Sequence, residues 1–306
     1  MKLRRALSLA AEVFVLFLFV RLLFSPQTAA QTIKNALVFC AQTLVPSLFV
    51  FIVLADRMAG MRLTALAAQK TGCGFMLWLL GSLCGVPVGA VLANGLYRSG
   101  AVNKRRAEYL IAFTNNAGVS FLLGYVGAGL FGNIYAGAKL TVCQLVSTAA
   151  TAVLLKFIMF GKARPSPRDR KRFREPPSPP RSAALPAANR PWYSSITGAA
   201  YSMLAICACA VFFSAVSQVT VALFGLSGAG EALLRSALEF SSGCACAANL
   251  PYKTAFVLCA FACGQTGLSV AVQVRAVTGG ALSMRPYLAG KAINCAIFML
   301  LAFFIG

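Results

Sequence analysis

Long apolar segments alternate with short basic ones along most of this chain. Two of the apolar segments, Gly72–Tyr97 and Tyr252–Val277, are interrupted by glycine, proline or polar residues. The others approach the roughly 20 residues that a membrane-spanning helix needs, and they are Ala6–Phe24, Ala36–Ala55, Ala107–Phe131, Ala136–Phe160, Ile196–Phe224 and Pro286–Ile305. The pattern predicts an all-α polytopic membrane protein with about six transmembrane helices and two irregular elements.

The first irregular element contains the sequence GSLCGVPVGAVLANG, residues 81–95. Segments rich in Lys and Arg stay in the cytoplasm, and they flank this element on both sides, with Arg57, Arg62 and Lys70 before it and Arg98, Lys104, Arg105 and Arg106 after it. Both ends of the element are therefore expected inside. We expect a re-entrant hairpin over residues 72–97 that turns at GVPVG; a single span kinked at Pro87 is the alternative.

The chain divides into four parts. Residues 1–30 form an expected N-terminal anchor helix, a retained signal anchor whose basic start stays in the cytoplasm. Residues 31–160 form a first repeat, and residues 193–306 form a second repeat with its own re-entrant hairpin at 252–277. Between them, residues 161–192 hold nine Lys or Arg and eight of the 13 prolines. That composition predicts a disordered cytoplasmic linker.

A weak internal repeat supports this division. The segment from Leu83 aligns without gaps on the segment from Ala262, so that Cys84-Gly85 meets Cys263-Gly264 and Asn115 meets Asn294. The loop charges place the two halves in opposite orientations across the membrane. Inverted repeats with broken helices are typical of secondary transporters, whose solutes bind near the midplane between the repeats.

Composition narrows the function further. The chain is 59% hydrophobic and carries a net charge of +21, which basic cytoplasmic loops explain without a nucleic-acid partner. The absence of histidine removes the commonest general base and metal ligand, and the 11 cysteines show no metal-ligand spacing. We therefore expect no catalytic residues, no metal site, no cofactor and no enzymatic activity.

Several motifs together resemble one family. They are LVPSLFVF, GSLCGVPVGAVLANGLYRSG, RRAEYLIAFTNNAGVSFLLGYVGAGLFGN, LEFSSGC and FACGQTGLSVAVQV. From about residue 36 onward, the chain resembles the stage V sporulation membrane proteins of the nucleoside-recognition (Gate) domain group.

The resemblance implies a permease of endospore-forming bacteria. Its best-known members move dipicolinate across the outer forespore membrane, and they are distantly similar to concentrative nucleoside transporters. The chain departs from the family in being shorter and in its hairpin, where Ala90 is followed by Val91 instead of a lysine. That departure puts the identity of the solute in question.

Polar residues inside apolar segments usually face a cavity or a partner, and they supply the candidate solute-binding residues. The TNN triplet, Thr114, Asn115 and Asn116, together with Gly118 predicts a helix break at membrane depth. The amides of the triplet and the backbone at the two hairpin tips suit a carboxylate or a base, and Lys291 suits a dicarboxylate. Lys291 could instead pair with Glu239 or extend to the membrane surface. The candidates are Gly85, Val86, Gly89, Asn94, Thr114, Asn115, Asn116, Gln265, Thr266, Ser269, Lys291 and Asn294. Hydrogen bonding between helices is the alternative role for the TNN triplet.

Glu239, with Ser241 and Ser242, is the candidate for coupling transport to H⁺ or Na⁺. An acid at the membrane interface is the alternative role for Glu239. The resulting hypothesis is a secondary transporter of a small anionic or polar solute, with dipicolinate as the solute that the resemblance favours. The expected partners are this dicarboxylate or nucleoside-like solute, a coupling ion and membrane lipid. A nucleoside or nucleobase permease and a sporulation membrane scaffold that does not transport are the alternatives.

Overall fold

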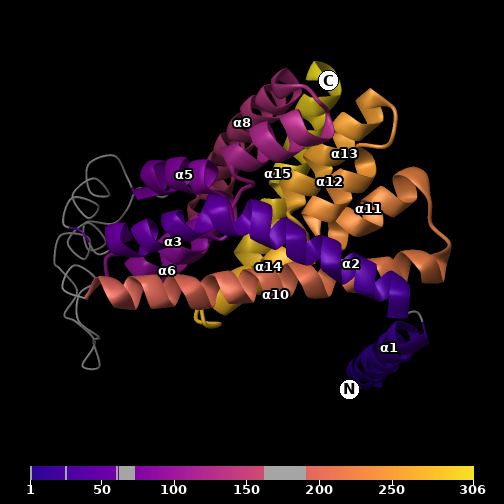
Figure 1. Cartoon of the computed structure of the whole chain (residues 1–306). Coiled ribbons are helices and arrows are strands. Elements are labelled where there is room, and N and C mark those ends of the chain that lie inside the picture. Colours follow the sequence, from indigo (N-terminus) through magenta and orange to yellow (C-terminus); the bar gives the residue numbers. More distant parts are fainter. Residues whose placement is uncertain (1, 25, 60, 62–72, 162–190) are drawn as a thin grey trace.

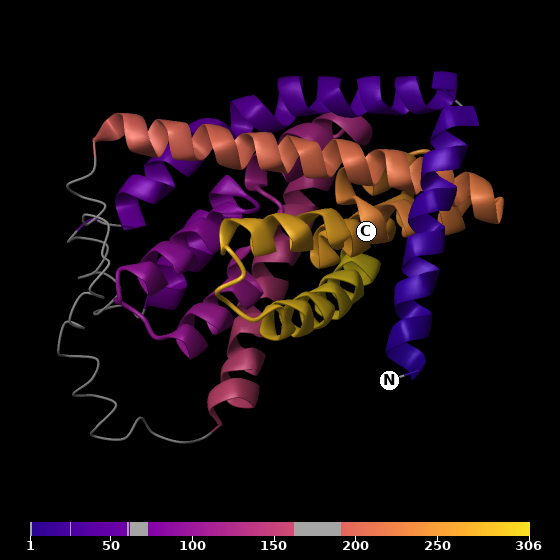
Figure 2. The same cartoon turned by 90° about the horizontal axis from the view of Figure 1, so that it is seen from below.

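The computed structural model describes residues 2–24, 26–59, 61, 73–161 and 191–306, and these residues contain helices and no strands. Figure 1 shows α10 (Trp192–Phe224) as a long rod along one side of the molecule, with α2 (Pro26–Phe39) beside it. The first helix, α1 (Lys2–Phe24), crosses the C-terminal end of α10 (Figure 2), where Leu18 contacts Val216 and Val219.

Within the described residues, four helices are long and apolar enough to cross a membrane, and they are Ile134–Phe160 (α8), Trp192–Phe224 (α10), Tyr252–Val277 and Met284–Ile305 (α15). A fifth candidate is the pair Ala30–Leu44 and Leu48–Met58, which is bent by 53°. This pair passes through the π-helix η1 (Cys40–Leu44) into α3 (Val45–Ala59). The prediction of an all-α polytopic membrane protein is confirmed, and the chain is an integral membrane protein.

The prediction of one span over Ala107–Phe131 is wrong, because these residues do not form one continuous helix. Helix α7 (Lys104–Thr114) ends at the TNN triplet, and the π-helix η3 (Phe121–Leu130) begins after Gly118. The break itself was expected from the three adjacent polar residues and the glycine. A turn of backbone at this depth is tolerated when protein surrounds it, and residues 111–118 are all buried.

The second expected hairpin, residues 252–277, is at odds with the structure. Helices α13 (Tyr252–Gln265) and α14 (Gly267–Val277) are separated by a single residue, and together they form a 26-residue segment that can span a membrane. Within an apolar stretch of 18 residues in this segment 67% of the residues are buried, against 33% in the corresponding stretches of α8 and α15, so the segment lies at the centre of the fold. The GQTG sequence interrupts the helix without reversing it. Thr266 (φ 63°) and Gly267 (φ 75°) leave the right-handed conformation, and the two helices still form one candidate span.

A pair of short helices occurs in each half instead. In the first half it is α5 (Cys73–Cys84) and α6 (Val88–Arg98), which are each too short to span. In the second half it is α11 (Gly228–Leu238) and α12 (Phe240–Ala247), which meet at Glu239. Helix α12 folds back on α11, since a Cβ on Gly243 would lie 2.5 Å from the Cα of Ser236. Insertion of residues 72–97 into the membrane as a re-entrant hairpin remains a prediction, and the 161–192 linker falls almost entirely outside the described residues.

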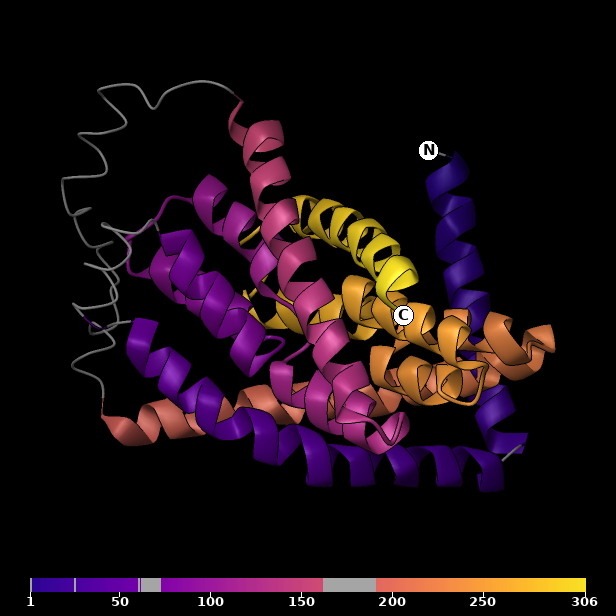
Figure 3. The ribbon, with the colours of Figure 1, turned by 90° about the horizontal axis from the view of Figure 1, so that it is seen from above.

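Helices α8, α13 and α15 form the centre of the molecule together with α7. Helices α8 and α15 run side by side (Figure 3), and Lys139 near the start of α8 donates a hydrogen bond to the Ile305 carbonyl at the end of α15. The fully buried side chains Phe256, Tyr287 and Phe298 belong to this core. The outer faces of α8 and α10 instead expose large apolar side chains, as helices that face lipid do.

Candidate functional site

At the break after α7, the side chains of the TNN triplet bond the backbone carbonyls at the end of the helix. Thr114 Oγ1 donates to the Leu110 carbonyl at 2.8 Å, Asn115 Nδ2 donates to the Ile111 carbonyl at 2.8 Å, and Asn116 Nδ2 donates to the Phe113 carbonyl at 2.9 Å. The last carbonyls of a helix have no partner within the helix. The TNN triplet supplies those partners where no water is available.

The same break is tied to the short pair α5 and α6. Asn115 Oδ1 accepts a hydrogen bond of 2.8 Å from the backbone N–H of Ala90, in the first turn of α6. Gly81 and Gly89 lie directly against the Thr114 carbonyl, where an added Cβ would come within 2.0 and 2.4 Å of the oxygen. Glycine is required at both positions because no larger residue admits this approach. The tip residue Gly85 likewise contacts Gly118.

At the break between α13 and α14, polar side chains likewise bond backbone groups. Gln265 Oε1 accepts from the backbone N–H of Gly267 at 2.8 Å, and Gln265 Nε2 donates to the Ser236 carbonyl of α11. Thr266 adopts φ 63°, and its hydroxyl lies 3.2 Å from the hydroxyl of Tyr287. Ser269 accepts from Gln273 at 3.2 Å. The amide at the start of α14, which was expected to face a solute, is thus bonded to protein.

Helix α15 joins the two breaks. Lys291 Nζ donates to the Asn115 carbonyl at the first break. One turn later, Asn294 Nδ2 donates to the Gly264 carbonyl at the second break, at 3.0 Å, and Asn294 Oδ1 accepts from Ser147 of α8 at 2.8 Å. We call the bonded residues at the two breaks and on α15 the break layer, and they are Thr114, Asn115, Asn116, Gln265, Thr266, Lys291 and Asn294. Lys291 bonds a backbone carbonyl, and the expected alternative of an ion pair with Glu239 is not formed.

The break layer therefore gathers most of the predicted solute-binding residues in one buried region. Asn94 lies apart from it on α6, donating to the Val277 carbonyl at 3.0 Å. Two buried amide oxygens, Asn94 Oδ1 and Gln144 Oε1, have no hydrogen-bond partner among the described residues. None of the predicted solute-binding residues lines the polar cavity at α11 and α12, and their role in solute binding stays a prediction.

A cavity of about 540 Å³ lies elsewhere, between α2, α10, α11, α12 and η3. The predicted coupling residues Glu239, Ser241 and Ser242 are on its wall. Its other polar lining residues are Thr32, Asn35, Tyr125, Ser214, Gln218, Glu231, Arg235, Cys246 and Asn249. We call this space the Arg235 cavity.

Glu239 is buried at the wall of the Arg235 cavity and caps the N-terminus of α12. Its carboxylate accepts from the backbone N–H of Ser241 at 3.1 Å, the backbone N–H of Ser242 at 2.7 Å and the hydroxyl of Ser241 at 2.6 Å. A carboxylate suits this position because the first N–H groups of a helix are unpaired and carry partial positive charge.

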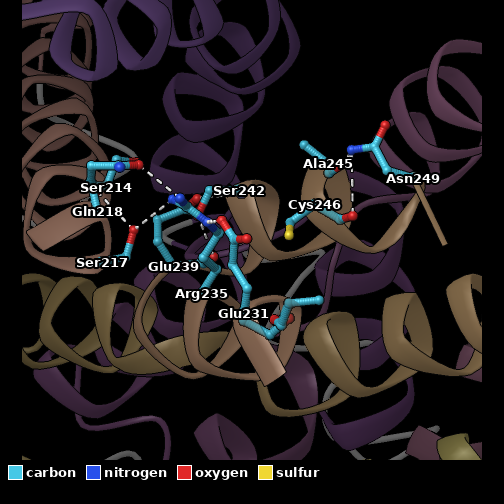
Figure 4. A network of polar contacts seen from close by, with 12 residues as sticks. Ser214, Ser217, Gln218, Glu231, Arg235, Glu239, Ser242, Ala245, Cys246 and Asn249 are labelled. Carbon is cyan, nitrogen blue, oxygen red and sulfur yellow. Dashed lines mark hydrogen bonds and ion pairs between the residues drawn. The ribbon is translucent and has the colours of Figure 1, made fainter. Parts of the chain in front are cut away.

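Arg235 is the one cation on the described wall of the cavity, and Figure 4 shows it at the centre of a polar network. Its Nε lies 2.7 Å from Glu231 Oε1, one turn earlier on α11. Its two terminal nitrogens donate to Gln218 Oε1 at 2.7 Å and to the Ser217 hydroxyl at 3.4 Å, both on α10. The bonds use three of the five N–H donors of a guanidinium.

The sequence analysis identified Glu239 and the two serines but missed Arg235, Glu231 and Gln218. One local signal was present, since Glu231 and Arg235 are four residues apart and such pairs meet on one face of a helix. The contribution of α10 and α2 could not be seen locally, because Gln218 lies 17 residues from Arg235. Thr32 and Asn35 reach the cavity only through the packing of α2 against α10.

Comparison with known proteins gives one informative similarity. The chain is similar to the sporulation integral membrane protein YlbJ of Bacillus subtilis (strain 168), with 25% identity over 167 residues. The aligned part covers 51% of this chain and 41% of that protein, so the chain matches less than half of its relative's length. No described protein family and no solved structure matches the chain.

Proposed function

We propose that this protein is a secondary transporter that carries a small polar or anionic solute through the Arg235 cavity. The observation that carries the proposal is a cavity of about 540 Å³ with a guanidinium and two carboxylates on its wall, inside a polytopic membrane protein. Charged groups in such proteins are costly and usually mark a solute or ion pathway. The helix break at Glu239 adds a further feature typical of transporter sites.

The charges on the wall support coupling to a cation. Arg235 faces two acidic residues, Glu231 and Glu239, so the wall carries more negative than positive charge when both acids are ionised. An anionic solute can bind Arg235 through a bidentate carboxylate contact. Its entry is favoured when H⁺ or Na⁺ neutralises one of the acids at the same time. Glu239 is the candidate for that role.

Dipicolinate, a planar aromatic dicarboxylate, is the proposed solute. The similarity to a sporulation integral membrane protein supports a role in endospore formation, and the guanidinium suits a carboxylate. The corresponding location is the bacterial cell membrane or the outer forespore membrane. Transport of this kind involves no covalent chemistry and no cofactor.

A nucleoside or nucleobase is the second candidate solute. Three amide side chains, Asn35, Gln218 and Asn249, line the cavity and could pair with the edge of a base. The third possibility, a membrane scaffold, would act through the basic segment 161–192, which lies outside the described residues.

The test is uptake of labelled dipicolinate into proteoliposomes that hold the full chain, with labelled uridine as the second solute. We expect saturable dipicolinate uptake that Arg235→Gln lowers at least about tenfold, which corresponds to about 1.4 kcal/mol of solute binding. The matched control is Arg275→Gln, because Arg275 is exposed on α14 and does not line the cavity. Uptake of uridine alone would select the nucleoside permease, and uptake of neither solute by folded protein would contradict the proposal.

A further inference from the structure

Lys291 is a buried lysine that has no carboxylate beside it among the described residues. Its side chain is 4% exposed, in the middle of α15. Among the described residues, no Asp or Glu forms an ion pair with it, and its hydrogen bond goes to the backbone carbonyl of Asn115. An unpaired buried charge is costly, so this arrangement needs a reason.

The position of the ammonium group supplies that reason. Asn115 is the residue that ends α7, and the C-terminal end of a helix carries partial negative charge. The Leu110, Ile111 and Phe113 carbonyls already accept from the TNN side chains. The Asn115 carbonyl is left for a cation. In transporters with broken helices, unwound carbonyls at the ends of half-helices are the groups that hold the coupling cation.

The surroundings of Lys291 contain no group that would replace this carbonyl as its charge partner. Tyr287 and Cys295 on α15 and Cys263 on α13 are the ionisable groups that act on it. Helix α8 presents the neutral Ser147 to this part of α15, through its bond to Asn294. The other charged side chains on the helices that contact α15 are not buried, and they are Lys104, Arg105, Arg106 and Glu108 on α7, Lys139 and Lys156 on α8, Lys253 on α13 and Arg275 on α14.

We propose that the Lys291 ammonium group is a tethered cation that fills the cation position of the α7 break, so that protons and not Na⁺ drive this transporter. The claim that protons drive transport rests on the proposed transport function. In one half of the cycle, Lys291 releases its proton to water and becomes a neutral amine. The charge-assisted bond to the Asn115 carbonyl is then lost, and α15 is released from the break. Uptake of a proton from the other side of the membrane restores the ammonium group and the bond.

Thermal unfolding of the purified full chain in detergent micelles tests the tethered cation without any solute. We expect Lys291→Ala to lower Tm by about 5–10 °C, and millimolar methylammonium to recover part of that loss by binding the vacated position. Neutral acetamide should have no such effect, and Na⁺ should leave the wild-type Tm unchanged. The matched control is Lys139→Ala, because Lys139 also donates to a backbone carbonyl but is exposed. Its Tm should change little and should not respond to methylammonium.

Two further variants separate charge from proton release. Lys291→Arg keeps the positive charge but cannot release the proton, so it should retain a Tm near that of the wild type and lose uptake driven by a pH gradient. Lys291→Met keeps the length of the side chain and serves if the alanine variant does not fold. It should still exchange solute across the membrane but should not accumulate it.

The outcomes are distinct. Stabilisation of the wild type by Na⁺, absence of any methylammonium effect on Lys291→Ala, or uptake that requires a Na⁺ gradient would each overturn the inference. Recovery by methylammonium, together with Na⁺-independent uptake driven by a pH gradient, is the expected result. If the wild type carries neither dipicolinate nor uridine, the proposed function fails, and the melting series still decides whether Lys291 is the tethered cation.

Discussion

The break layer and the Arg235 cavity are both rich in polar side chains, but these side chains are bonded differently. In the break layer, Asn115, Gln265 and Asn294 donate to backbone carbonyls that helix interruptions leave without partners. In the cavity, Arg235 is bonded to other side chains, namely Glu231, Gln218 and Ser217. Backbone partners are fixed by the fold, whereas side-chain partners can change rotamer and exchange for a solute.

This difference separates two roles that look alike in the sequence. A polar residue in an apolar segment signals a constrained position, but the constraint can be a helix break as well as a ligand. We infer that the break layer holds the halves of the molecule together and that the cavity carries the solute. Substitutions in the break layer should therefore cost stability first, except at Lys291, where we assign the charge to coupling. Substitutions around the cavity should cost transport first.

Gly81→Ala should have the largest effect on stability. The new Cβ would lie 2.0 Å from the Thr114 carbonyl oxygen, so α5 must move away from the break. We expect a loss of about 3 kcal/mol in the free energy of unfolding, at the upper end of overpacking costs, measured as a fall in Tm in detergent. Gly124→Ala is the control because nothing lies within 4 Å of a Cβ there. Equal effects of the two substitutions would show that α5 does not press on the break.

Asn294→Ala should be the next most damaging change. It leaves the buried Gly264 carbonyl without this partner and removes one of the two bonds of the Ser147 hydroxyl, which keeps its bond to the Gln144 carbonyl. The expected cost is about 2 kcal/mol. The control is Asn249→Ala, since Asn249 is exposed and should change stability by less than about 0.5 kcal/mol. Loss of uptake by Asn294→Ala at an unchanged Tm would place Asn294 in the solute site and would blur the distinction between the two regions.

Glu239→Gln should cost about 1 kcal/mol, because glutamine can accept at one atom only and weakens the cap of α12. Its larger effect should be on transport, where we expect solute uptake to fall by more than the Tm change explains. The pair of readouts is Tm and initial uptake rate in proteoliposomes. Glu231→Gln is the comparison, because Glu231 lies on the same wall but caps no helix. Unchanged uptake by Glu239→Gln would remove Glu239 from the coupling role.

Ser217→Ala should have the smallest effect. The contact from Arg235 to the Ser217 hydroxyl is 3.4 Å long, near the limit for a hydrogen bond. We expect a stability change below about 0.5 kcal/mol and a decrease in uptake smaller than that of Arg235→Gln. A loss of uptake as large as that of Arg235→Gln would show that Ser217 itself contacts the solute.

Three of the expected spans, Ala136–Phe160, Ile196–Phe224 and Pro286–Ile305, and the first break could be predicted from the sequence because their signals are local. A long apolar run indicates a spanning helix, and the TNN triplet followed by Gly118 indicates the break after α7. The hairpin of the second half was misplaced because GQTG resembles GVPVG in composition. Reversal of the chain occurs instead at Glu239, where α12 doubles back on α11, and the close contact of Gly243 with Ser236 that permits it depends on packing.

The cavity could be predicted only in part. Glu239 is marked by its position beside an apolar run, but the opposite wall comes from α2 and α10, which are remote in sequence. Arg235 belongs to a short helix that offers no sign of facing inward. Its role depends on the meeting of α11 with Ser217 and Gln218 in the second half of α10.

Helix α10, one of the candidate membrane spans, is longer than the hydrocarbon core of a bilayer is thick. At 1.5 Å per residue its 33 residues extend about 50 Å, whereas the hydrocarbon core of a bilayer is about 30 Å thick. The helix begins with the exposed aromatic residues Trp192 and Tyr193, and Arg57 stacks on the Trp192 ring at 4.5 Å. Such aromatic and basic residues anchor a helix at the headgroup level. The excess length must then be taken up by tilt or must project beyond the far leaflet, so the thickness of the host bilayer acts directly on the helix that forms one wall of the cavity.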